Sequence, residues 1–167
     1  FDVSFPLNDA FDPLAWLGEQ QCYPQFYWQQ RNGDEELAAL GAVNQFSSLA
    51  LASQFLREQN AAQDTRVCGL NAFNPEQGSL FLPRLLWRRT AGNATLRLQL
   101  WSDRSLVEDA RAALDFLQRL RPAKSIRPLS VQVEHETHQP QQAEWLKLIR
   151  RATETIARGE FEKVVLA

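Results

Sequence analysis

The chain has 167 residues, a mass of 19.1 kDa and a formal net charge of −2. Hydrophobic residues make up 44% and charged residues 23%, which is typical of a globular domain and argues against a disordered segment. The 7 glycines and 8 prolines are too few for a collagen-like or low-complexity chain. The sequence contains no methionine, even at position 1, so we expect the chain to begin after its natural start.

Hydrophobic periodicity and turn residues predict alternating strands and helices along the chain. In chain order, the predicted elements are a helix at 9–20, strands at 25–31 and 35–43, a helix from 47 or 48 to about 58, strands at 66–73, 79–89 and 94–101, a helix at 105–120, an alternating apolar stretch at 129–135, a helix at about 141–158 and a strand at 161–167. The short connections between successive strands favour antiparallel pairing.

Residues at the ends of the helices sharpen this prediction. Asp9 or Asp12 is expected to cap the first helix, because a carboxylate can accept backbone N–H groups of the first turn. Residues 105–108, Ser-Leu-Val-Glu, form the pattern of a capping box. Gly159 lies where a helix C-cap glycine belongs.

The strands indicate a sheet with one buried face. Leucines alternate with polar residues at 94–101, which is the period of a half-buried strand. Pro83 lies inside the strand at 79–89 and predicts either an edge position or a bulge, because proline has no N–H to donate. The predicted fold class is α+β, with a largely antiparallel sheet packed with three or four helices.

Charge is unevenly distributed along the chain. Residues 1–83 contain 10 acidic and 3 basic residues, a net charge of −7, whereas residues 84–167 contain 10 acidic and 15 basic residues, a net charge of +5. Arginine, which supplies 15 of the 18 basic residues in the whole chain, suits an anionic ligand bound through paired hydrogen bonds. The alternative is a solvated face of mixed charge. The pI of about 5.7 argues against a nucleic-acid partner.

Several common kinds of site lack their sequence signature. There is no Gly-rich phosphate loop, no G-x-S-x-G elbow and no Cys–His nucleophile pattern. The two histidines of Glu134–His138 are three residues apart, unlike those of HExxH, so an exposed polar loop is favoured over a metal site. Cys22 and Cys68 are expected to be free thiols in a reducing cytosol.

Membrane and export signals are also missing from the sequence. No apolar run approaches the roughly 18 residues that span a bilayer. The first 20 residues are acidic and lack the basic start of a signal peptide. We therefore expect a cytoplasmic protein that has no membrane partner.

The last residues carry the candidate catalytic group. In a strand, Lys163 would share one face with Phe161 and Val165 and would project from a row of apolar neighbours. Partial burial lowers the pKa of a lysine, and a neutral amine near pH 7 acts as a general base. The alternative is an ordinary strand lysine whose side chain reaches solvent.

The run from Ile156 to Ala167, I-A-x-G-E-x-x-K-V-V-L-A, resembles the entry to the catalytic domain of the chorismate-utilising enzymes. That family includes isochorismate, salicylate, anthranilate and aminodeoxychorismate synthases. Residues 24–35, 69–75 and 82–89 resemble the N-terminal region of isochorismate synthases of the menaquinone pathway. The resemblance covers essentially the whole chain and implies the N-terminal part of the anthranilate-synthase-like chorismate-binding fold.

The resemblance also implies a reaction, the Mg²⁺-dependent isomerisation of chorismate to isochorismate. Isochorismate and salicylate synthases carry lysine at the position of Lys163 as the base that activates water, whereas anthranilate synthases typically carry glutamine. Lys163 would take a proton from the water that attacks C2 of the ring. A glutamate outside this chain would protonate the departing C4 hydroxyl.

Members of this family are considerably longer than the present chain. Their general-acid glutamate and their magnesium-binding glutamates are therefore expected beyond residue 167, and Lys163 is the one catalytic residue that can be carried over. The predicted domains are an N-terminal α+β region at 1–140 and the start of the chorismate-binding catalytic region at 141–167.

Two alternatives stay open beside isochorismate synthase. A salicylate synthase shares the lysine and adds a pyruvate-lyase step, although the menaquinone-type N-terminal segment argues against it. A non-catalytic α+β binding or scaffold domain would use Lys163 as an ordinary strand residue. Chorismate is the small-molecule partner that the resemblance implies, and the sequence does not determine the oligomeric state.

Overall fold

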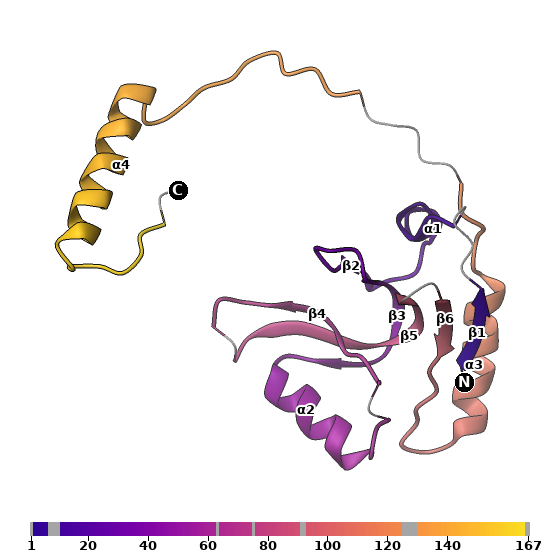
Figure 1. Ribbon diagram of the computed structural model, residues 1–167. Helices are drawn as coiled ribbons and strands as arrows, with labels where there is room; N and C mark the ends of the chain where they lie inside the picture. The colour runs from indigo at the N-terminus through magenta and orange to yellow at the C-terminus, as the bar shows by residue number, and fades with distance from the viewer. Residues whose placement is uncertain are drawn as a thin grey trace. The chain divides into compact units, whose positions relative to one another are not determined.

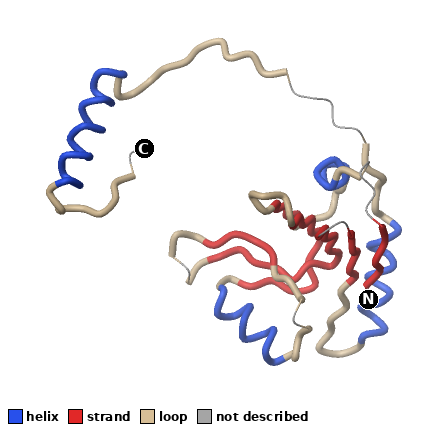
Figure 2. Tube along the Cα trace, viewed as in Figure 1, coloured by secondary structure: helices blue, strands red, loops and turns tan. Residues whose placement is uncertain are grey.

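The computed structural model of the chain describes residues 2–6, 11–62, 64–74, 76–90, 93–124 and 130–165, with 2–6 described as backbone alone (Figure 1). The chain divides into two compact units, Phe1–Ile126 and Arg127–Ala167. In the described residues, the first unit contains an antiparallel sheet with three helices, and the second contains one helix (Figure 2).

The order of the elements matches most of the prediction. The first unit contains β1 (Asp2–Pro6), α1 (Pro13–Glu19), β2 (Gln25–Gln29), β3 (Glu35–Phe46), α2 (Leu49–Glu58), β4 (Cys68–Asn71), β5 (Gly78–Thr90), β6 (Asn93–Leu98) and α3 (Leu106–Gln118), and the second contains α4 (Gln142–Ala157). Every pairing between described strands is antiparallel, in the order β1-β6-β5-β3-β2 with β4 also paired to β5. The α+β prediction is confirmed.

Pro83 lies in the central strand β5. One side of β5 pairs with β3, and the other side pairs with β4 over Gly78–Phe81 and with β6 over Leu85–Thr90. Pro83 falls between these last two partners and opposite Ala42, where the register of β3 shifts. Proline is tolerated there because the ladder is already irregular on both sides. Of the two predicted settings, the edge position is wrong, and Pro83 instead lies at a register shift, that is, a bulge or a similar irregularity of the ladder.

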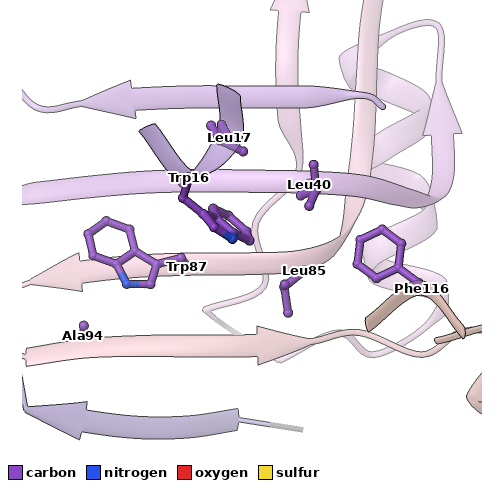
Figure 3. Close-up of a cluster of buried hydrophobic side chains, with 8 residues drawn as sticks. Trp16, Leu17, Leu40, Leu85, Trp87, Ala94 and Phe116 are labelled. Atoms are coloured by element: carbon purple, nitrogen blue, oxygen red, sulfur yellow. The ribbon is translucent and has the colours of Figure 1, made fainter. Parts of the chain in front are cut away.

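The helices α1 and α3 pack on one face of the sheet (Figure 3). Their buried side chains meet alternate residues of β3 and β5, as a period of two requires. The cluster consists of Trp16, Leu17, Ala38, Leu40, Leu85, Trp87, Ala94 and Phe116. Neighbouring residues of the same strands face away from this cluster and pack in a second one, Leu37, Ala39, Cys68, Phe81 and Leu86. The sheet is therefore buried on both faces in its middle.

The N-cap residues of α1 and α3 differ in the hydrogen bonds that they make. Asp12 Oδ1 accepts the N–H groups of Leu14 and Ala15 at 2.9 and 3.0 Å, and this is one of the two predicted caps; Asp9 lies outside the described residues. The capping box predicted at 105–108 is not formed. Ser105 is the N-cap residue of α3, but its side chain makes no capping hydrogen bond, and its N–H donates to Ser102 Oγ at 3.0 Å.

The alternating apolar stretch at 129–135 and the strand predicted at 161–167 show no strand in their described residues. Residues 130–135 are irregular, and Val131 and Val133 are 78% and 77% exposed; Leu129 lies outside the described residues. Residues 161–165 are irregular as well, and 166–167 are not described. A strand needs a neighbour that supplies its ladder of hydrogen bonds, and neither stretch pairs with a described strand. The strand predicted at 161–167 is therefore wrong for the described residues 161–165, and the alternation at 129–135 does not mark a strand in residues 130–135.

Gly69 provides a test of the close packing between β4 and β5. Its φ is +143°, and a Cβ at this position would lie 2.1 Å from the backbone oxygen of Ser79. We expect Gly69→Ala to lower the free energy of unfolding by about 2–4 kcal/mol, because backbone must move to admit the methyl group. Urea denaturation followed by tryptophan fluorescence measures the change.

Gly18→Ala is the matched control. Gly18 lies in α1, and a Cβ there would meet no heavy atom within 4 Å. This variant is expected to be as stable as the parent or up to about 1 kcal/mol more stable, since alanine favours a helix over glycine. Equal stability of the two variants would contradict the strain assigned to Gly69.

Candidate functional site

Gly159 ends α4 and directs the chain toward the candidate catalytic lysine. Its φ is +74°, its N–H donates to Ile156 O at 2.9 Å, and the N–H of Glu160 donates to Thr155 O at 3.3 Å. This pair of bonds is the Schellman arrangement, which favours glycine because its left-handed backbone strains other residues. The predicted C-cap glycine is confirmed.

Lys163 follows in the irregular segment after this cap. Its side chain is exposed, as are those of Phe161 and Val165, so the expectation of a partly buried strand lysine is not met in this unit. An ion pair between Arg158 Nε and Glu160 Oε1, 2.9 Å apart, lies just before the segment. The catalytic role of Lys163 stays a prediction.

The three upstream stretches that resemble isochorismate synthases lie in one part of the sheet. Residues 24–35 form β2 and the turn into β3, residues 69–75 include the end of β4, and residues 82–89 lie in β5. The strands β2, β3, β5 and β4 are hydrogen-bonded to one another in that order. The three stretches therefore belong to one sheet, with β3 between β2 and β5, and β4 is paired to the part of β5 that precedes Leu82.

A buried carboxylate connects the first and last of these stretches. Tyr27 Oη donates to Glu36 Oε1 at 2.6 Å, and Arg89 Nη2 lies 2.5 Å from Glu36 Oε2. The Glu36 side chain is 5% exposed. Burial, together with the hydrogen bond and the charge of Glu36, raises the pKa of Tyr27 to about 12. Tyr27 is therefore a neutral donor near pH 7 and links β2 to β3.

Arg84 and Asp109 form a second buried connection, between β5 and α3. Two guanidinium nitrogens donate to the two Asp109 oxygens at 2.7 and 2.6 Å, and the side chains are 11% and 13% exposed. Asp109 also accepts the N–H of Trp101 at 2.8 Å, and Arg84 donates to Gln99 O at 2.9 Å. The hydrogen bonds from Arg84 lower the pKa of Asp109. The pair holds the segment between β6 and α3 in place.

The arginines of β5 and β6 form ion pairs with carboxylates. Besides Arg84 and Arg89, Arg88 Nε lies 2.7 Å from Glu35 Oε1, and Arg97 pairs with Asp64. These pairs favour the interpretation of mixed charge over an anion-binding surface for this part of the chain. Sequence reasoning missed the Arg84 and Glu36 networks, although an arginine inside an apolar strand and a glutamate before a buried run are signals for them.

The remaining candidates show no assembled site. In Glu134–His138 the side chains are exposed, and His138 Nε2 lies 3.0 Å from Glu136 Oε1. The described residues contain no group of three His, Cys, Asp or Glu side chains that could hold a metal ion. In the same part of the chain, no helix has the length and apolar character needed to cross a membrane.

The two cysteines are free thiols in different surroundings. Cys22 is half-buried, whereas Cys68 is buried, and burial raises the pKa of its thiol to about 12. In a Cys22→Ser variant, we expect a disulfide reagent to modify Cys68 on the order of 100-fold more slowly in the folded protein than in urea, because the thiolate is the reactive form. The control is a Cys68→Ser variant, in which Cys22 is the thiol that reacts. In the folded protein, Cys22 should react faster than Cys68 does, because it is only half-buried.

The same shift has a consequence for stability at high pH. The folded protein favours the neutral Cys68 thiol, whose ordinary pKa is 9.0, so its contribution is complete below pH 9 and is lost as the pH rises toward 12. In the modification experiment, a rapid reaction of Cys68 in the folded protein would contradict the burial of this thiol and, with it, the expected dependence of stability on pH.

Comparison with known proteins decides the family. The model of the family described as chorismate binding enzyme matches residues 63–167, which include β4, β5, β6, α3, α4 and Lys163. The chain belongs to this family. The resemblance seen in the sequence is thereby confirmed.

Curated relatives within the chorismate-binding family are isochorismate synthases. The chain is 54% identical over 166 residues to isochorismate synthase MenF of Escherichia coli (strain K12), covering 99% of this chain and 38% of that protein. Identity to MenF of Pasteurella multocida (strain Pm70) is 32% over 159 residues, covering 95% and 35%. The chain thus spans well under half the length of these relatives.

A solved structure agrees with the family assignment. MenF, the menaquinone-specific isochorismate synthase from Escherichia coli, superposes with a TM-score of 0.76 at 53% identity, covering 94% of this chain and 37% of that chain. The predicted chorismate-binding α+β fold is confirmed by this match.

Proposed function

We propose that this chain is the N-terminal part of an isochorismate synthase, an isomerase that converts chorismate to isochorismate. The observation that carries the proposal is the 54% identity to isochorismate synthase MenF across 99% of the chain. The structural match to the menaquinone-specific enzyme supports a role in menaquinone synthesis.

In the proposed reaction, Lys163 is the general base. In the full-length enzyme, the amine of Lys163 takes a proton from the water that attacks C2 of chorismate. The C4 hydroxyl leaves as water after protonation by an acid outside residues 1–167. One water is added and one is released, so the reaction is an isomerisation.

Magnesium is part of the proposal but is not assigned to residues of this chain. The described residues contain no cluster of ligands that suits the ion, so no step of the reaction is assigned to a metal held by them. The resemblance to longer members of the family implies magnesium-binding glutamates beyond residue 167.

Product analysis tests the proposed function. The full-length protein that contains this sequence is incubated with chorismate and Mg²⁺, and the products are separated by chromatography. Isochorismate is the expected product, and the isolated 167-residue chain, as the control, is expected to form none. Salicylate as the main product would favour a salicylate synthase instead. Failure of the full-length protein to consume chorismate would favour the non-catalytic binding or scaffold domain.

A further inference from the structure

We draw no further inference here: the strongest candidate, the apolar cavity of about 320 Å³ that Phe11, Trp16, Trp87, Leu96 and Leu117 line between α1, the sheet and α3, is walled by hydrophobic side chains, and nothing in the part of the chain that the structure describes shows what occupies or covers it.

Discussion

Replacing Lys163 with alanine in the full-length protein is expected to lower kcat for isochorismate formation by about 10²–10⁴-fold, the usual contribution of a general base. Water is a weak nucleophile, so loss of the group that takes its proton slows the attack on C2. The Lys163 side chain is exposed in its own unit, and its truncation leaves no cavity there. The thermal midpoint should therefore stay within a degree or two of the parent. Product formation at saturating chorismate, followed by chromatography, measures kcat.

Lys147→Ala is the matched control for this experiment. Lys147 is also an exposed lysine of the second unit, in α4, and the proposed reaction gives it no role. Its replacement is expected to leave kcat nearly unchanged. If Lys163→Ala keeps the activity of the parent, Lys163 is not the base. If both variants lose activity together with thermal stability, the loss is structural, and the base assignment is equally contradicted.

Asp109→Ala is expected to have the largest effect on stability, a loss of about 3–5 kcal/mol in the free energy of unfolding. The variant leaves the Arg84 guanidinium, 11% exposed, without its carboxylate, and it removes the acceptor of the Trp101 N–H. A buried charge without a partner costs more than the original pair contributed. Urea denaturation monitored by the fluorescence of the buried Trp16 and Trp87 reports the change.

Two further variants distinguish the loss of the buried ion pair from the mere loss of a side chain in α3. Asp115→Ala removes an exposed carboxylate from the same helix, α3, and is expected to change stability by less than about 0.5 kcal/mol. The double variant Arg84→Met with Asp109→Leu removes both charges and should recover most of the loss. Equal losses in Asp109→Ala and Asp115→Ala would contradict the role assigned to the pair.

The pair also predicts how stability responds to acid. Arg84 lowers the pKa of Asp109 below its ordinary value of 3.8, so the carboxylate contributes its stabilisation above that pH and loses it as the pH falls through the lowered pKa. The parent should therefore lose stability more steeply below pH 4 than Asp109→Ala does. Parallel acid-unfolding curves for the two proteins would contradict this coupling.

Local features of the fold were predictable because their causes are local. Asp12 accepts the N–H groups of the turn that follows it, and Gly159 adopts a left-handed backbone at the end of α4, with partners only a few residues away. The turn at Asn32-Gly33, a dipeptide typical of tight turns, likewise joins β2 to β3. The capping box is not formed although it too is local, and the N–H of Ser105 donates to Ser102 Oγ in place of the Glu108 side chain.

For the candidate site, too, some features could be predicted from the sequence and others could not. The family and the position of Lys163 could be identified from the sequence because the motif from Ile156 to Ala167 is a contiguous run of residue types. The surroundings of Lys163 could not, since a strand there needs pairing that no described residue provides. The role of Lys163 therefore depends on the test in the full-length protein.

The sequence by itself determined the α+β class, the order of most elements, the glycine cap of α4 at Gly159 and the membership of the chorismate-binding family, and it narrowed the cap of α1 to Asp9 or Asp12. Only the tertiary structure decided that Pro83 lies in the central strand and that Arg84 meets Asp109 across 25 positions of sequence. Those outcomes depend on which strands become neighbours and on which charges must find partners once burial removes water from them.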